Sequence, residues 1–162
     1  MRAVQHSLYL CLFVCTFVCC KKETKKTIKT AEITFSKEGR LSIFNATTDS
    51  IQAQFDIEIA ESDYETQTGL MYRKRMEEHQ GMLFIFSDLR QHYFHMKNTE
   101  FSLDIIFIDE NLKIASFQKN AKPYSEDLLP SNVPVKYVLE INGGLSEKLD
   151  INVGDKVEFL KL

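Results

Sequence analysis

Cysteine is missing from this chain after residue 20, and tryptophan is missing throughout. The four cysteines are Cys11, Cys15, Cys19 and Cys20. A disulfide framework needs paired thiols spread through the fold, and a thiol nucleophile or a cysteine metal site needs a thiol there. The sequence from residue 21 onward therefore excludes all three kinds of site.

Proline and catalytic motifs are scarce as well. All three prolines lie within residues 119–134, which are therefore expected to form a long loop that serves as a lid or rim. The chain has no glycine-rich phosphate loop, no nucleophile-elbow motif and no HExxH motif. No reaction class is thus indicated by a motif, and whether the protein is an enzyme stays open.

Basic residues are few where the chain is expected to fold. Residues 31–162 contain 14 Lys and Arg against 22 Asp and Glu, a net charge of −8, whereas the whole chain carries −3. Binding to nucleic acid depends on a basic surface, so we expect no nucleic-acid partner. The compensating lysines gather in residues 21–30, KKETKKTIKT, which are predicted to form a polar tether.

An apolar run from Leu8 to Cys20 follows Arg2 and His6 at the start of the chain. The run is too short to span a bilayer comfortably, and it matches the apolar part of a secretory signal. Because it ends in FVCC, residues 1–20 resemble a bacterial lipoprotein signal, with Cys20 as the lipidated residue and Cys19 as the alternative. An uncleaved N-terminal anchor is the other interpretation. Both place the domain in the cell envelope, on the periplasmic side of a membrane.

Apolar and polar residues alternate along residues 51–59, which is the pattern of a half-buried strand. Gly39 and residues 109–111 are predicted turns, the second within a hairpin. Other strand-like runs are residues 31–35, 41–44, 82–86, 93–97, 103–108, 112–118, 135–141 and 156–161.

Two short helices are predicted between these strands. Ser62 and Glu65 form a capping box, so the first helix begins at Ser62, and the second covers residues 145–150. The pattern predicts a mostly β (α+β) domain over residues 31–162. We expect a compact β-sandwich or barrel-like fold of about eight short strands with one or two short helices.

Six short motifs occur in a fixed order: GLM-x-R at 69–73, GMLF at 81–84, MKNT at 96–99, LDIIFID at 103–109, YVLE at 137–140 and GD at 154–155. Together they resemble the DUF192 family, also called UPF0127. The resemblance implies a compact, mostly β domain, often found behind an export signal, with no established biochemical role. This chain departs from the family pattern at His95, where Trp is usual, and at Ser102, where Pro is usual. It also has Asn111 in place of a hairpin Gly, a change that a positive φ at Asn accommodates.

Polar residues within and beside these motifs form a candidate pocket: Arg73, Lys97, Asn98, Thr99 and Asp104. Arg73 and Lys97 suit an anionic group, and Asp104 suits an acid or base if burial shifts its pKa. The alternative is a structural network of ion pairs and turns that holds the hairpins together. Glu140 is expected to face outward from its strand.

A copper site is a further hypothesis, with His92 and His95 joined by the soft ligands Met71, Met82 and Met96. Two histidines three residues apart on a strand project to opposite faces, and methionines among Leu and Phe usually fill a core. We therefore expect no metal ion and no cofactor.

The leading functional hypothesis is a lipid-anchored envelope module that binds a small molecule or a protein partner. It follows from the export signal, the single small domain and the lack of a catalytic motif. Two alternatives stay open: an enzyme built on Asp104, Lys97 and Arg73, and a periplasmic copper-binding protein.

Overall fold

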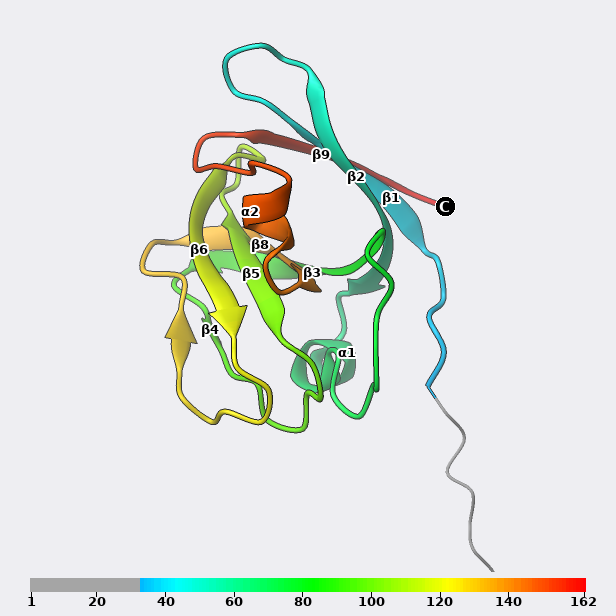
Figure 1. Cartoon of the computed structure of the whole chain (residues 1–162). Coiled ribbons are helices and arrows are strands. Elements are labelled where there is room, and N and C mark those ends of the chain that lie inside the picture. Colours follow the sequence, from blue (N-terminus) through cyan, green and yellow to red (C-terminus); the bar gives the residue numbers. More distant parts are fainter. Residues whose placement is uncertain (1–32) are drawn as a thin grey trace, which may run out of the picture. The chain divides into compact units, whose positions relative to one another are not determined.

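The computed structural model describes residues 33–162, which form one domain (Figure 1). The predicted signal peptide, the predicted lipidation site Cys20 and the predicted tether at residues 21–30 lie outside the described residues. Within residues 33–162, no helix has the length and apolar character needed to cross a bilayer.

Strands dominate the described domain, which confirms the mostly β prediction. The two helices are α1 (Asp63–Thr68) and α2 (Leu145–Lys148). The strands are β1 (Gly39–Phe44), β2 (Ile51–Ala60), β3 (Gln80–Arg90), β4 (Tyr93–Phe94), β5 (Leu103–Ile108), β6 (Ile114–Ala121), β7 (Leu129–Pro130), β8 (Val135–Asn142) and β9 (Lys156–Lys161).

Seven strands form one sheet in the order β6-β5-β8-β3-β2-β1-β9, while β4 pairs with β7 apart from it. All neighbours in the sheet are antiparallel except β2 and β3, whose parallel pairing requires the crossover that contains α1. Lys113 bridges to Lys156, and the Val157 N–H donates to the Leu112 carbonyl. The two edges of the sheet therefore meet at one end, and the sheet curls towards a barrel without closing (Figure 1).

The central strands carry a hydrophobic core on each face, because successive side chains point to opposite sides. Leu83 and Leu139 pack with Leu145 of α2 in the first core. Phe84 and Val138 belong to the second core, on the other face. Coverage on both sides buries all six residues of β5 and most of β8.

The predicted capping box is confirmed. The Ser62 Oγ accepts from the Glu65 N–H at 3.3 Å, and the Glu65 carboxylate accepts from the Ser62 N–H at 3.0 Å. Helix α1 ends because Gly69 takes a φ of +47°, and a Cβ there would lie 3.1 Å from the Phe84 ring. Glycine thus lets the chain turn tightly against the second core, beside the pocket described below.

Three local predictions are wrong in the described residues. The strand predicted at residues 31–35 is not formed by residues 33–35, the part of it that the structure describes, and Gly39 is not a turn but the first residue of β1. A Cβ at Gly39 would lie 2.7 Å from the Leu160 carbonyl oxygen, so glycine permits the close approach of β9. In the hairpin between β5 and β6, the positive φ falls on Leu112 rather than Asn111.

Candidate functional site

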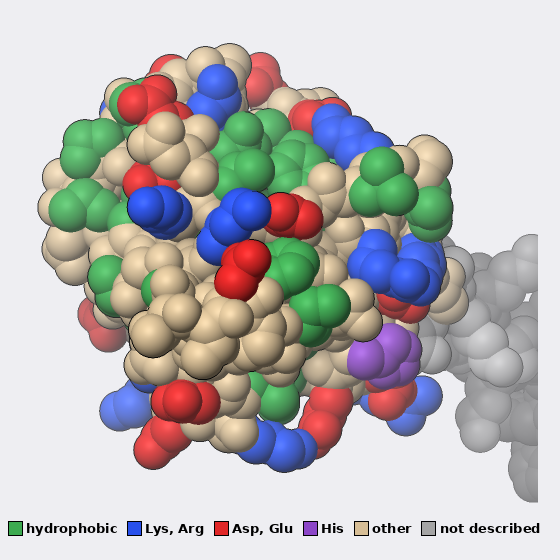
Figure 2. Space-filling view, turned by 90° about the horizontal axis from the view of Figure 1, so that it is seen from above, with side chains coloured by type: hydrophobic (Ala, Val, Ile, Leu, Met, Phe, Trp, Pro, Cys, Tyr) green, Lys and Arg blue, Asp and Glu red, His purple; other side chains and the backbone are tan. Residues whose placement is uncertain are grey.

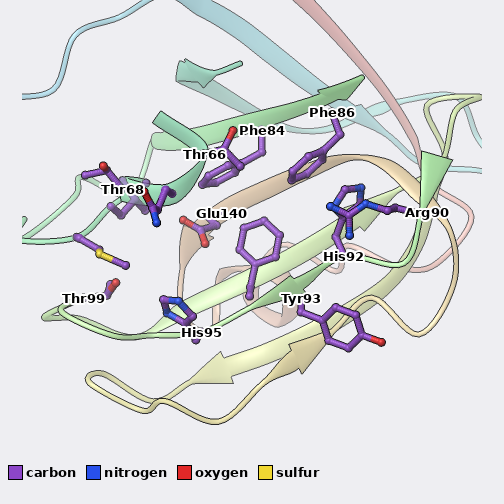
Figure 3. A pocket seen from close by; sticks show the side chains of 15 residues that line it. Thr66, Thr68, Phe84, Phe86, Arg90, His92, Tyr93, His95, Thr99 and Glu140 are labelled. Carbon is purple, nitrogen blue, oxygen red and sulfur yellow. The ribbon is translucent and has the colours of Figure 1, made fainter. Parts of the chain in front are cut away.

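A pocket of about 300 Å³ opens beside the second core (Figure 3). Its walls come from the end of α1 and the turn after it, from β3, from the chain around β4, and from β8. The lining residues are Thr66, Gln67, Thr68, Gly69, Leu70, Met71, Phe84, Phe86, Arg90, His92, Tyr93, Phe94, His95, Thr99 and Glu140.

Glu140 is the most unusual of these residues. It lies on β8 between Met82 of β3 and Ile105 of β5, and it is only 5% exposed. Its carboxyl points into the pocket (Figure 3). Within residues 33–162, no hydrogen bond or ion pair reaches that carboxyl. The expectation that Glu140 faces outward is therefore wrong, because both faces of β8 are covered.

Burial raises the pKa of Glu140 to about 8 from an ordinary value of 4.5, because an apolar environment disfavours the charged form. At neutral pH most of the empty protein therefore carries a neutral carboxylic acid at this position. A neutral acid can donate one hydrogen bond and accept others, and an ionised one can pair with a cation.

Aromatic rings form the wall around this carboxyl. The Phe84 and Phe94 rings meet edge to face at 5.1 Å between centroids, and Phe94 also contacts Phe107 at 6.0 Å. The Phe86 ring stacks on His92 at 3.7 Å. Such packing fixes each ring, so the aromatic part of the wall is preset.

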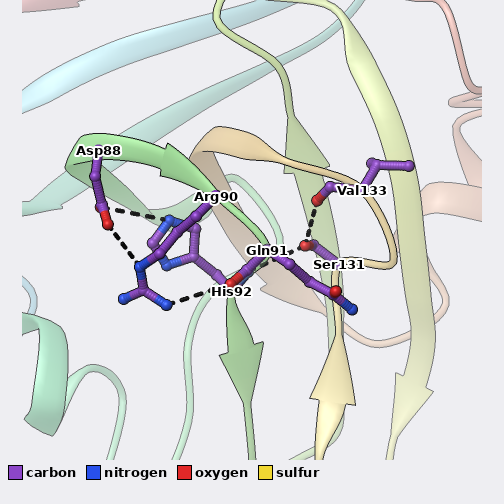
Figure 4. Close-up of polar contacts among 6 residues, drawn as sticks. All are labelled: Asp88, Arg90, Gln91, His92, Ser131 and Val133. Carbon is purple, nitrogen blue, oxygen red and sulfur yellow. Dashed lines mark hydrogen bonds and ion pairs between the residues drawn. The ribbon is translucent and has the colours of Figure 1, made fainter.

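His92 lies at one end of the pocket, beside Arg90 and Asp88 (Figure 4). The Arg90 Nε donates to Asp88 at 2.6 Å. The His92 Nε2 is 3.8 Å from the other Asp88 oxygen, too far for a hydrogen bond, and has no hydrogen-bond partner within residues 33–162. Burial, assisted by the Arg90 charge, lowers the pKa of His92, so its ring is neutral at neutral pH.

The proline-containing loop braces this wall instead of covering the pocket. The His92 N–H donates to the Ser131 Oγ at 3.1 Å, and the Ser131 N–H donates back to the His92 carbonyl at 2.9 Å. Ser131 also donates to the Val133 carbonyl at 2.6 Å (Figure 4). No residue from 119–134 lines the pocket, so the loop supports β4 from outside.

The structure does not bring the five predicted pocket residues together. Thr99 alone among them lines the pocket. Arg73 pairs with the buried Glu58 carboxylate, and the exposed Lys97 lies 3.9 Å from the Glu126 carboxylate. Both cations thus form ion pairs of the kind expected from a structural network, which was the alternative to an anion-binding pocket.

Asn98 and Asp104 also make contacts that hold the fold. Asn98 takes a φ of +56°, and its side chain donates to the Tyr72 hydroxyl at 2.9 Å. The fully buried Asp104 accepts the backbone N–H groups of Asn120 and Ser146, both at 2.8 Å. These two bonds tie β6 and the start of α2 to β5.

The histidines and methionines of the copper hypothesis are divided. Strand β4 is only two residues long, so His92 and His95 lie beyond its two ends and both line the pocket, contrary to the prediction of opposite faces. Met71 lines it as well, whereas Met82 and Met96 are buried in the second core. Within residues 33–162, no three His, Cys, Asp or Glu side chains are grouped so that they could hold a metal ion.

Comparison with known proteins gives a family but no activity. Residues 44–159 match the model of the DUF192 family, described as Uncharacterized ACR. A protein of unknown function from Novosphingobium aromaticivorans DSM 12444 is 37% identical with a TM-score of 0.70, over 74% of this chain and 83% of that chain. A protein from Sinorhizobium meliloti 1021, described as a candidate transcription regulator, is 34% identical with a TM-score of 0.73, over 79% and 97%. No curated protein matches. Since the family model spans most of the folded residues, this chain belongs to the DUF192 family.

Proposed function

We propose that this protein is an exported, lipid-anchored module of the cell envelope whose folded domain binds a small organic ligand. The binding site is the pocket around Glu140. The observation that carries the proposal is the buried Glu140 carboxyl, which points into an aromatic pocket and has no partner among residues 33–162.

An unpartnered polar group in an apolar environment lowers stability, by about 1–3 kcal/mol for a neutral group. A ligand that supplies the missing hydrogen-bond or charge partner regains this free energy. Small-molecule sites typically combine apolar and aromatic walls with a few polar groups that orient the ligand. The pocket around Glu140 combines phenylalanine rings with a larger share of polar groups, among them Thr66, His92 and Thr99.

The place of action follows from the sequence. The apolar run that ends at Cys20 and the lysine-rich residues 21–30 support export and a lipid anchor. A domain held in this way samples small molecules outside the cytoplasm.

Regulation of transcription, the role named for the Sinorhizobium protein, is not favoured here. The net charge of −8 over residues 31–162 opposes binding to DNA. Figure 2 shows acidic and basic side chains interspersed on one face, with no continuous basic patch there.

Blocking the pocket tests the binding function. Thr66 lies on α1 and lines the pocket, so Thr66→Trp should fill part of the space. Tyr64→Trp is the matched control, because Tyr64 is on the same helix, is 75% exposed and does not line the pocket. A library of small polar and aromatic molecules would be screened by thermal shift on the full-length chain.

A ligand present at 100 times its Kd stabilises the folded state by about 2.7 kcal/mol, which a thermal shift detects. We expect compounds that stabilise the wild type and the Tyr64→Trp variant but lose their effect with Thr66→Trp. A library without any such compound, or hits that bind equally well after Thr66→Trp, would contradict a ligand site in this pocket.

A further inference from the structure

The Glu140 carboxyl has no counter-charge within the pocket. Arg90 contributes the one Lys or Arg side chain among the described lining residues, and its guanidinium is engaged. Its Nε donates to Asp88 at 2.6 Å, and another of its nitrogens donates to the Gln91 carbonyl at 3.2 Å. Within residues 33–162 no Lys, Arg or His side chain pairs with Glu140, so this position is open to a cation that a ligand supplies.

The walls of the pocket suit a cation with an apolar body. Phe84, Phe86 and Phe94 surround the carboxyl, and the faces of aromatic rings attract ammonium groups. The other titratable groups of the lining are Arg90, His92, Tyr93 and His95. Burial lowers the pKa of His92 and Arg90 is paired with Asp88, so each of these two groups repels a positive ligand less than a free cation would.

The surface beside the pocket is acidic. A second groove of about 600 Å³ shares Thr66, Phe86 and Arg90 with the pocket and is therefore continuous with it. This groove adds the carboxylates of Glu61, Asp63 and Asp88, of which Asp88 is paired with Arg90 and Glu61 with Lys161. The excess of carboxylates over cations in this groove favours the approach of cations and disfavours anions.

From these observations we infer that the ligand is an organic amine whose ammonium group pairs with Glu140 while its apolar part packs against the phenylalanines. The inference rests on the proposed binding function and names the class of ligand. The exchange of charge is balanced, because the ammonium enters as the Glu140 proton leaves to the buffer.

Release of this proton distinguishes an ammonium from other ligands. The empty pocket holds a largely neutral Glu140 at neutral pH, so binding of a cation that ionises it should release about one proton. A neutral alcohol would accept a hydrogen bond from the acid and release none. A carboxylate ligand would accept a hydrogen bond from the neutral Glu140, which would keep its proton.

Calorimetric titration of the full-length chain at neutral pH supplies the test. The probes are benzylamine, benzyl alcohol and benzoate, which are of similar size and differ in charge. Each titration is run in two buffers of different ionisation enthalpy, so that the proton count is measured directly. Glu140→Gln removes the anchor, and Glu110→Gln makes the same chemical change on the exposed hairpin turn.

We expect benzylamine to bind at least ~10-fold more tightly than either other probe and to release about one proton. Glu140→Gln should weaken benzylamine by at least ~10-fold, whereas Glu110→Gln should leave its Kd unchanged.

Binding of benzyl alcohol or benzoate as tightly as benzylamine, lost with Thr66→Trp, would overturn the amine inference and leave the pocket function standing. Benzylamine binding that persists in Glu140→Gln or releases no proton would also overturn it. If none of the three probes binds, the amine inference fails, and the library screen then decides the binding function separately.

Discussion

Replacing Glu140 with glutamine should remove a pH dependence from the stability of the domain. The unfolded chain holds the Glu140 proton up to about the ordinary pKa of 4.5, whereas the folded chain holds it up to about 8. Between these values the folded state binds more protons than the unfolded state. Raising the pH through this window therefore lowers the free energy of unfolding.

The size of the effect follows from the interval between the two pKa values. Each pH unit of the interval is worth about 1.36 kcal/mol, so the full cost of ionising Glu140 is about 5 kcal/mol. Between pH 5 and pH 9 the wild type should lose about 4 kcal/mol relative to Glu140→Gln, because glutamine has the same shape and does not ionise.

Urea denaturation of both proteins at a series of pH values measures this difference. His92 has the opposite pH dependence, since burial lowers its pKa, but it acts in both proteins and cancels in the comparison. Glu110→Gln, on the exposed hairpin turn, should follow the wild type. Wild-type and Glu140→Gln stabilities that stay parallel across this range would refute the assignment of a buried, unpaired carboxyl.

Three further predictions concern other residues. Arg73→Met leaves the buried Glu58 without its cation and should lower the free energy of unfolding by about 3–5 kcal/mol in urea denaturation, whereas an unchanged value would show that the pair is not structural. Asp104→Asn places an amide against two backbone donors and should cost about 1–3 kcal/mol without changing ligand affinity. Loss of ligand affinity at full stability would instead favour the enzyme hypothesis built on Asp104. Changing both Cys19 and Cys20 to Ser should release the protein from membranes or block its processing, and unchanged fractionation and mass would refute lipidation.

Strands and caps can be predicted from the sequence where they depend on residues that are near one another in the chain. The predicted strands at residues 103–108 and 156–161 have the observed bounds of β5 and β9, because apolar residues concentrate in the first and Val157 and Phe159 alternate with charged residues in the second. The capping box at Ser62 depends on residues three positions apart and was predicted for the same reason.

The pocket could not be predicted, because its walls come from segments far apart in the chain. Residues 66–71, 84–99 and 140 meet only after β8 inserts between β3 and β5. Lys97 and Asp104 are close in the sequence, but neither lines the pocket.

The sequence does contain a signal that Glu140 is buried. Glu140 interrupts a continuous apolar run, Val138-Leu139-Glu140-Ile141, and such a run is typical of a strand that is covered on both faces. A carboxylate inside it is therefore expected to be buried. An outward-facing Glu140 would need one open face of β8, whereas Leu139 and Val138 pack into a core on each face.

The pKa of the Glu140 carboxyl, measured by carbon-13 NMR with and without benzylamine, tests the central claim most directly. We expect the side-chain carboxyl of the free protein to titrate near pH 8, and saturating benzylamine to shift this midpoint well downward. A midpoint near the ordinary value of 4.5 in the free protein would contradict the buried, unpaired carboxyl. A midpoint near 8 that benzylamine leaves unchanged would contradict pairing with an ammonium group.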